Sequence, residues 1–284
     1  MHYSQSEYIS LSVQEILDNG FTLITANKNG IPKIIESLKN SIDKLFKKES
    51  WRGGWEGREQ YMVENKLFNS GAKRLSNLID KDEIFIELIN NKILLKICRI
   101  AFKEDFFIGG VDAREPMKGN GQQDLHQDWI PKTKKNINKI ENIIAFIFLD
   151  NTNKENGAMR LVPKSHRKEG WVCNNLKDPS RKHPEEVNIE AETGDILLMD
   201  ATLWHSGTAN KTGKRRRVIY IDYRIRSIPQ LLNQKKYLSE ETINKLDESQ
   251  KALLKVRKED PISEKVSCTS GDYCREKGIQ WPGG

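Results

Sequence analysis

The sequence predicts a mostly β protein with flanking helices, built around a sandwich or jelly roll. Between about residues 105 and 227, short apolar runs alternate with Gly, Pro, Asn and Asp, which is typical of strands joined by tight turns. Helical periodicity dominates the first hundred residues and returns after residue 239. The chain has no βαβ alternation and no glycine-rich phosphate loop, which argues against a nucleotide-binding α/β fold.

The N-terminal part is expected to be helix-rich. Apolar residues between 11 and 17 indicate a helix that ends at Gly20, and residues 21–24 indicate a short strand. Between residues 31 and 46, apolar side chains recur every three or four positions, with Pro32 where a first helical turn tolerates it. This spacing predicts an amphipathic helix.

The later elements complete a single domain over residues 1–284. A helix-rich part covers about 1–100, the jelly-roll core about 103–227, and a C-terminal helix and tail about 228–284. The expected elements are a loop at 51–57, one or two helices over 75–98, strands at 106–113, 143–149, 159–162, 195–200 and 216–223, and a charged amphipathic helix over 239–258.

Composition excludes several classes of protein. The chain has 284 residues, of which 37% are hydrophobic, and it has no apolar run of about 18 residues that could span a membrane. Its N-terminus lacks the pattern of a secretory signal, so we expect a cytoplasmic protein. The four cysteines are too scattered for a disulfide framework, although the last two could close a small loop or bind zinc. They are Cys98, Cys173, Cys268 and Cys274.

The net charge of +7 is concentrated in two segments. The sequence has no RNA-binding module, helix-turn-helix pattern or basic helix, so we do not expect a nucleic-acid partner. A positive mouth around a binding site would instead favour a dianionic small molecule. The clustered basic residues are Lys132, Lys134, Lys135 and Lys139 in one segment, and Lys211, Lys214, Arg215, Arg216 and Arg217 in the other.

Two of the five histidines lie in contexts that suggest a metal site. His126 and Asp128 are two residues apart, so on a strand both side chains would project from one face. His205 follows the apolar segment 194–204, which is expected to be a single strand. Two histidines and one carboxylate form the facial triad of non-haem iron enzymes, which leaves open positions for a bidentate cosubstrate and O₂. A zinc hydrolase is the alternative with the same ligand types.

Four sequence blocks in order carry a resemblance to a known family. The sequence resembles the phytanoyl-CoA dioxygenase (PhyH) family of Fe(II)/2-oxoglutarate-dependent oxygenases. The blocks are Arg114-x-Pro116 with Gly119 and Gln123 leading to His126-x-Asp128; Asn156-Gly157-Ala158-Met159-Arg160-Leu161-Val162-Pro163-x-Ser165-His166; Gly194-Asp195 leading to Trp204-His205; and His205, Asn210 and Arg216 in series.

The resemblance implies a double-stranded β-helix, the cupin-like jelly roll, as the catalytic domain. It implies that His126, Asp128 and His205 bind Fe(II), and that an arginine eleven residues after the distal histidine, Arg216, binds the cosubstrate 2-oxoglutarate. Strand alternation places Arg216 on the face opposite to Arg215 and Arg217, and a slip of one residue would transfer the role to either neighbour.

Several further residues are candidates for binding. Gln123 could hydrogen-bond 2-oxoglutarate or substrate, or pack in a turn. Ser206 and Thr208 could assist the cosubstrate carboxylate. His166 is expected to orient a loop rather than to bind metal, and residues 131–142 are a candidate loop over the site. The candidate substrate residues are Arg114 and Arg160, which could anchor an anionic group or equally pair with a structural carboxylate, and Trp129 and Trp204, which flank the metal ligands and could contact substrate or form part of the wall or core.

The predicted function is therefore oxidation of a small molecule by an Fe(II)- and 2-oxoglutarate-dependent dioxygenase. Hydroxylation is the first expectation, with release of succinate and CO₂ and with secondary metabolism as a candidate setting. Asp128 disfavours halogenation, because related halogenases have a small residue at this position. Three alternatives remain open: a non-catalytic jelly roll that binds or senses a small molecule, a nucleic-acid- or protein-modifying member suggested by the high pI, and an oxygenase that desaturates, cyclises or epimerises. Nothing in the sequence points to a particular oligomeric state.

Overall fold

The computed structural model describes residues 4–49, 71–129, 136 and 139–261. The expected loop at 51–57, most of the candidate loop at 131–142, and the pair Cys268 and Cys274 lie outside the described residues. Within the described part of the chain, no helix is long and apolar enough to cross a membrane.

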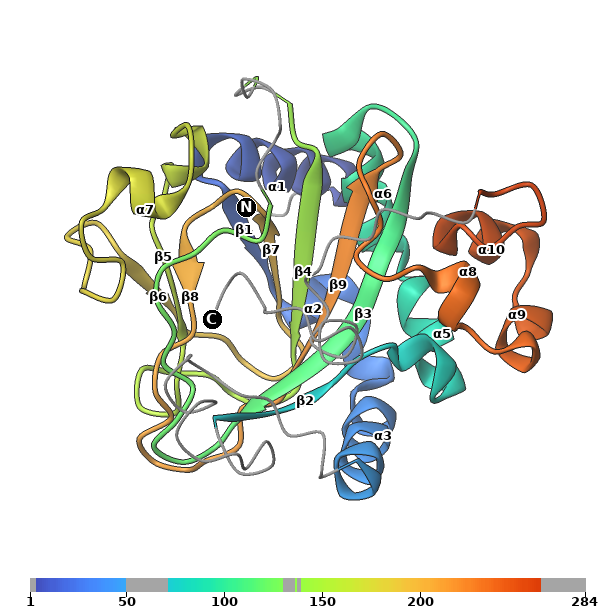
Figure 1. Ribbon diagram of the computed structural model, residues 1–284, viewed down its shortest axis with the longest axis horizontal. Helices are drawn as coiled ribbons and strands as arrows, with labels where there is room; N and C mark the ends of the chain where they lie inside the picture. Colours follow the sequence, from blue (N-terminus) through green and yellow to red (C-terminus); the bar gives the residue numbers. More distant parts are fainter. Residues whose placement is uncertain (1–3, 50–70, 130–135, 137–138, 262–284) are drawn as a thin grey trace.

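Two antiparallel sheets form the core of the structure (Figure 1). The larger sheet has six strands in the order β1 (Phe21–Ile24), β7 (Ile196–Asp200), β4 (Asn142–Phe148), β9 (Val218–Ile225), β3 (Phe106–Pro116) and β2 (Ala72–Leu75). The smaller sheet has three strands in the order β6 (Val187–Ile189), β5 (Met159–Leu161) and β8 (His205–Ser206). This arrangement confirms the predicted jelly roll.

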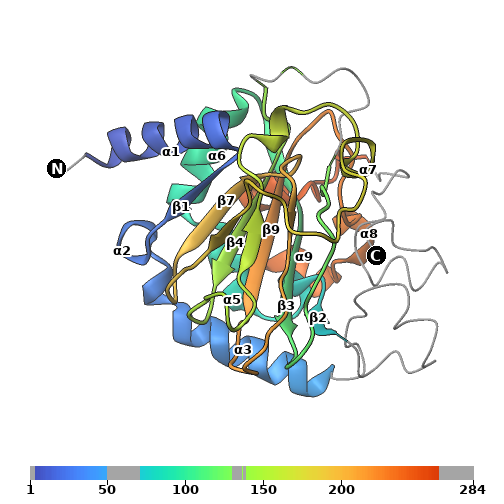
Figure 2. The same cartoon turned by 90° about the vertical axis from the view of Figure 1, so that its left-hand side faces the viewer.

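Helices cover the face of the large sheet that points away from the small sheet. Figure 1 shows α5 and the C-terminal helices on this side, and Figure 2 shows α1 and α3 at opposite ends of it. The helices outside the small sheet are α1 (Gln5–Asn19), α2 (Ala26–Asn29), α3 (Ile35–Lys48), α5 (Glu83–Ile89), α6 (Lys92–Phe102), α8 (Gln234–Tyr237), α9 (Glu240–Lys245) and α10 (Glu248–Leu254), with single 3₁₀ turns at Ile31–Lys33, Leu78–Asp80 and Ser165–Arg167. The short helix α7 (Val172–Asn175) lies beside the small sheet (Figure 1).

Strand β4 is buried on both faces because it separates two apolar clusters. Ile143, Ala145 and Ile147 pack into the cluster formed with the covering helices. The alternate residues Ile144 and Phe146 pack between the two sheets. Side chains alternate across a strand, so one continuous apolar run supplies both layers. The space between the sheets is where the functional side chains lie.

The segment 194–204 does not form a single strand, contrary to expectation. Strand β7 ends at Asp200, and the chain turns before β8 begins at His205 in the other sheet. The Asp200 carboxylate accepts hydrogen bonds from the Thr202 backbone N–H (2.8 Å) and hydroxyl (2.6 Å). Such a local side-chain bond closes a turn in competition with the sheet. The turn moves His205 from the large sheet to the small one.

Three other elements differ from the predictions. Strand β9 begins at Val218 rather than at Arg216. Residues Ala72–Leu75 form a strand where a helix was expected to begin, because they pair with β3. The C-terminal helix is divided into α9 and α10, because the Asp247 carboxylate accepts a hydrogen bond from the Gln250 N–H and starts a new helix.

Gly20 ends α1 and should be sensitive to substitution. Its φ of 91° is left-handed, and a Cβ there would overlap the side chains of Leu203 and His166. We expect Gly20→Ala to lower the free energy of unfolding by about 2–4 kcal/mol, from backbone strain plus the clash. Gly30 (φ +80°) is a matched control, because nothing lies within 4 Å of a Cβ there. If chemical denaturation gave equal losses in the free energy of unfolding for Gly20→Ala and Gly30→Ala, the contacts of Gly20 with Leu203 and His166 would have no cost.

Candidate active site

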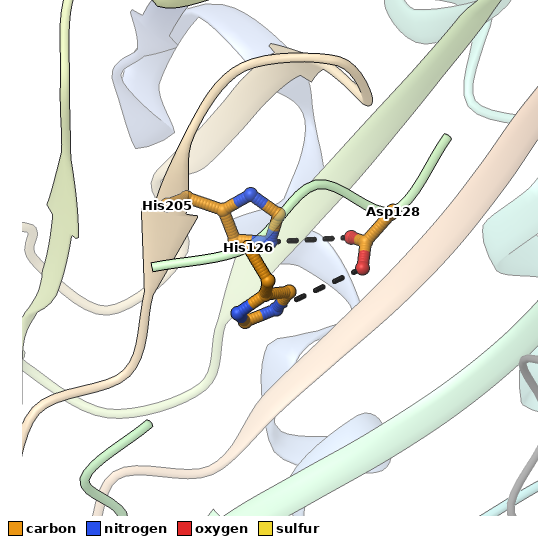
Figure 3. A group of neighbouring side chains, drawn as sticks. All are labelled: His126, Asp128 and His205. Atoms are coloured by element: carbon orange, nitrogen blue, oxygen red, sulfur yellow. Dashed lines mark ion pairs between the residues drawn. The ribbon is translucent and has the colours of Figure 1, made fainter. Parts of the chain in front are cut away.

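His126, Asp128 and His205 converge on one point between the sheets (Figure 3). The spacing of His126 and Asp128 suggested a regular strand. His126 instead forms an isolated antiparallel bridge with His205. Each backbone N–H of this pair donates to the other residue's carbonyl, at 2.9 and 3.0 Å. The Asp128 N–H donates to the Ala201 carbonyl at 2.9 Å. Backbone pairing therefore brings together ligands that are far apart in sequence.

The two imidazoles are oriented by backbone carbonyls. Nδ1 of His126 donates to the Asp124 carbonyl (2.8 Å), and Nδ1 of His205 donates to the Leu203 carbonyl (2.9 Å). Each ring therefore presents an unprotonated Nε2 to the centre, which is the form that binds a metal. These hydrogen bonds fix both the tautomer and the orientation of each imidazole ring before a metal binds.

The ligand spacing fits an octahedral ion. The Nε2 atoms of His126 and His205 lie 3.8 and 3.2 Å from the Asp128 carboxylate oxygens, and the ligand atoms of the triad all lie within 4.8 Å of one another. An octahedral ion with bonds of about 2.1 Å holds adjacent ligands about 3 Å apart. A modest contraction would complete the coordination.

The protonation states also suit metal binding. Burial and the neighbouring His205 lower the pKa of His126 to about 4, so this ring is neutral near pH 7. Burial opposes ionisation of Asp128, but the two imidazoles and Arg224 outweigh it and hold the pKa of Asp128 at about 2. Burial is likewise outweighed at His205, where Asp128 raises the pKa. A metal cation entering the site would therefore find Asp128 ionised and His126 neutral. Only at His205 would it compete with a proton for the ring nitrogen.

A cavity that opens to solvent adjoins the triad between the sheets. Three other predicted residues line it beside the triad, namely Arg114, Gln123 and Arg216; further polar lining residues are Arg74, Tyr220, Asp222 and Arg224, and apolar ones are Ile144, Phe146, Met159, Val218 and Leu231.

Arg216 reaches this cavity while its neighbours do not. Its side chain is 1% exposed, and its Nε and Nη1 have no hydrogen-bond partner among the described residues. Burial lowers the pKa of Arg216 to about 10. A buried guanidinium with two unused donors is suited to the flat, bidentate face of a carboxylate.

The neighbouring arginines are neutralised on the opposite face. Arg215 bonds Glu115 (2.6 Å) and Asp43 (2.7 Å), and Arg217 bonds Asp150 (2.6 Å) and Asp43 (3.0 Å). The predicted alternation is thus observed. Acidic partners offset the charges of Arg215 and Arg217, so of these three arginines Arg216 alone brings its charge to the cavity. Lys132, Lys134 and Lys135 lie outside the described residues.

The family assignment follows from comparison with known proteins. The model of the family described as "Phytanoyl-CoA dioxygenase (PhyH)" matches residues 32–218, which is more than half of the chain. The chain belongs to the phytanoyl-CoA dioxygenase family. Membership confirms the resemblance, the enzyme class of Fe(II)/2-oxoglutarate-dependent dioxygenase, and the cofactor and cosubstrate that go with it.

Curated relatives and solved structures agree with this assignment. The dioxygenase andF of Emericella variicolor is 25% identical over 225 residues, covering 76% of this chain and 74% of the relative. HygX from Streptomyces hygroscopicus, with nickel and 2-oxoglutarate bound, is 14% identical with a TM-score of 0.60, covering 78% of this chain and 89% of that one. The epimerase SnoN from nogalamycin biosynthesis has the same identity and TM-score, with coverage of 78% and 84%. The two solved structures show a shared fold.

Gln123 and Arg114 lie beside Arg216 in this dioxygenase. The Gln123 side-chain oxygen accepts a hydrogen bond from the Gly207 N–H at 3.2 Å. Arg114 Nη2 donates to the Gly121 carbonyl at 3.3 Å. Burial, together with repulsion from Arg216, lowers the pKa of Arg114 to about 9. Two buried cations at one end of the cavity make that end selective for anions.

Arg160 and Ser206 bond each other and do not line the cavity, so Ser206 does not have its predicted role toward the cosubstrate, and Arg160 has the second of its two expected roles, that of a partner for a structural carboxylate. Arg160 Nε donates to Ser206 Oγ at 2.6 Å, and Nη1 donates to Glu186 at 3.1 Å. The same guanidinium donates to the carbonyls of Arg181 (3.0 Å) and Gln123 (3.3 Å). Arg160 therefore fixes the segment after α7 to the metal-binding strand β8.

The other predicted residues that do not line the cavity have structural contacts. Thr208 donates its hydroxyl to the Ala158 carbonyl at 2.7 Å. Trp204 is fully buried, with the Lys168 ammonium 4.8 Å from its ring centroid. Trp129 stacks on the Arg224 guanidinium at 5.6 Å. His166 pairs with the Leu17 carbonyl at 3.1 Å, which confirms its expected structural role.

Sequence reasoning missed four polar residues of the cavity. Tyr220, Asp222 and Arg224 continue, along β9, the alternation that begins at Arg216, so the same pattern could have identified them. Arg74 gave no such signal, because it reaches the cavity only through the pairing of β2 with β3.

Arg160 provides a test of this supporting shell. Its ion pair with Glu186 is buried, with side chains 4% and 7% exposed. We expect Arg160→Ala to lower the free energy of unfolding by about 3–5 kcal/mol, because a carboxylate is left buried without its partner. Arg181→Ala is the control, since that side chain is 83% exposed and its pair with Asp178 lies on the surface. Similar losses for both variants in urea denaturation would contradict the expectation.

Proposed function

We propose that this dioxygenase hydroxylates a small molecule. In the overall reaction, a substrate C–H bond becomes C–OH with one oxygen atom of O₂, and 2-oxoglutarate takes the other as it loses CO₂ and becomes succinate. His126, Asp128 and His205 would hold the iron, which supplies the oxygen-activating chemistry when bound. Arg216 would bind the far carboxylate of 2-oxoglutarate.

One observation carries the proposal: the triad and Arg216 line the same cavity. The triad offers one face of an octahedral ion, and Arg216 offers two unused donors from a buried guanidinium. Gln123, held by the Gly207 N–H, lies on the same wall and can contact the cosubstrate. Arg114 adds a second cation at this end, which favours a dianion such as 2-oxoglutarate.

The presence of Asp128 supports oxygenation over halogenation. Its carboxylate occupies the position that a halide would need, and its pKa of about 2 keeps it ionised. The fold is also used by an epimerase, so the outcome of the reaction depends on how the substrate lies in the cavity. Hydroxylation is the outcome that needs no further group from the protein.

The test is a screen of metabolite pools with purified enzyme, Fe(II), 2-oxoglutarate and ¹⁸O₂. A substrate should release succinate in proportion to its consumption, and the product should carry one ¹⁸O atom. Succinate release with a product of unchanged mass would replace hydroxylation by epimerisation, and loss of two hydrogens would indicate desaturation or cyclisation. A substrate that binds without succinate release would favour a non-catalytic role.

A further inference from the structure

Strand β9 and the residues just before it line the cavity along its length. Arg216, Val218, Tyr220, Asp222 and Arg224 all line the cavity, as alternate residues of one extended segment should. At about 3.3 Å per residue, Arg216 and Asp222 lie about 20 Å apart along the strand. Two-oxoglutarate has a five-carbon chain and cannot reach both. The end at Asp222 is therefore available to another molecule.

Asp222 is a buried carboxylate with an unused oxygen at this second end. The residue is 2% exposed, and its Oδ2 accepts a hydrogen bond from Arg224 Nε. Its Oδ1 makes no hydrogen bond of good geometry among the described residues, although the Asn142 side chain lies near enough to lower the pKa of this carboxyl. A buried polar atom without a partner is costly, and native structures normally satisfy it with protein, water or ligand.

The ion pair is held in place from three sides. Arg224 Nη1 donates to the Pro229 carbonyl at 2.8 Å, and the guanidinium stacks on Trp129. Gly109 lies in a bulge of β3, where a Cβ would overlap the Asp222 carboxylate. The contacts with Pro229 and Trp129 hold Arg224 in place, and Arg224 in turn holds the Asp222 carboxylate, so the position of Oδ1 is fixed.

Both apolar and polar groups surround Asp222. Its Cα partner on β4 is Ile144, and its partner on β3 is Gly110, beside which the Leu231 side chain lies. The charged and amide groups that act on Asp222 are Arg224, Asp128 and Asn142. Burial raises the pKa of Asp222, and Arg224 opposes this. A donor from a ligand would stabilise the carboxylate further.

We propose that Asp222 recognises the substrate by accepting, at Oδ1, a hydrogen bond from a hydroxyl or ammonium group. The body of that substrate is apolar and lies against Ile144 and Leu231, while 2-oxoglutarate occupies the Arg216 end. This inference rests on the proposed function, because it takes the end at Asp222 as the place where the substrate meets the metal.

The test uses three probes that share one ring and differ in the polar group: cyclohexanol, cyclohexylammonium and cyclohexanecarboxylate. Each is titrated by saturation-transfer NMR into the full chain loaded with Ni(II) and 2-oxoglutarate, so that no turnover occurs. We expect the alcohol or the ammonium to bind at least about tenfold more tightly than the carboxylate. The stronger of the two identifies the donor that the site prefers.

Asp222→Asn should remove most of this preference, because the amide keeps the size but loses the charge. Asp112→Asn is the matched control: that buried residue is the Cα partner of Tyr220, but its Oδ1 already accepts from the Asn77 N–H at 3.0 Å. We expect this control to keep the wild-type preference. Circular dichroism and 2-oxoglutarate affinity, measured on the same samples, show whether each variant is folded and loaded.

The outcomes separate this inference from the proposed function. Failure of the wild-type protein to bind 2-oxoglutarate would contradict the proposed function. Three results, each obtained with 2-oxoglutarate bound, would overturn the role of Asp222. The first is equal affinity for the three probes, and the second is no binding of the alcohol or the ammonium at about 10 mM. The third is an unchanged preference among the probes in Asp222→Asn. If that variant does not fold, a wild-type crystal soaked with cyclohexylammonium decides: its nitrogen should lie about 3 Å from Asp222 Oδ1, and any other position overturns the proposal.

Discussion

His205→Ala and Asp128→Ala should each abolish turnover and lower the affinity for Fe(II) by more than about 100-fold. Loss of even a supporting residue around a metal ligand commonly costs 10–100-fold, and these two side chains supply ligand atoms themselves. They also form the shorter contact of the triad, at 3.2 Å. Metal affinity is measured by calorimetry, and turnover by succinate released from 2-oxoglutarate without added substrate.

His166→Ala is the matched control for the triad. It is also a buried histidine with one ring nitrogen near a backbone carbonyl, but it lies on the outer side of the turn and does not line the cavity. We expect this variant to lose stability and to keep its Fe(II) affinity. Undiminished succinate release in either triad variant would show that the metal site lies elsewhere.

Arg216→Leu should weaken 2-oxoglutarate binding by at least about 100-fold while Fe(II) affinity is retained. A bidentate, charge-assisted pair in a buried site contributes roughly 3 kcal/mol or more, which corresponds to this factor. The measurement is a titration of the Fe(II)-loaded protein with 2-oxoglutarate under anaerobic conditions, followed by the metal-to-ligand absorption band.

The adjacent Arg215 is the control that the chain itself provides. Its guanidinium is bonded to Glu115 and Asp43 on the opposite face. Arg215→Leu should change the affinity for 2-oxoglutarate by less than about threefold, as expected for a substitution outside the site. A larger effect for Arg215 than for Arg216 would mean that the register of the segment before β9 is wrong.

Much of the site could be predicted from the sequence because its residues follow local patterns. The His126-x-Asp128 spacing, the distal His205 and the alternation around Arg216 depend on neighbours in the chain, and family membership supports their interpretation. The same holds for β1, for α1 ending at Gly20 and for the division of β4 between two apolar layers.

The remaining features were decided by tertiary structure. Whether an arginine faces a ligand or a buried acid depends on what the fold places opposite it. The sequence left both roles open for Arg160, and the fold pairs it with Glu186. Arg74 enters the cavity only through the pairing of β2 with β3, and the turn at Asp200 separates β7 from β8.

The sequence by itself indicated the class of fold and the family, and it predicted a candidate set of metal ligands. Only the tertiary structure decided that the cavity has two ends, one cationic at Arg216 and one with a carboxylate at Asp222. The physical reason is that ligand types and strand periodicity are short-range properties of the chain. The neutralisation of a charge depends on partners such as Asp43 and Glu115, about 100 or more residues away from Arg215.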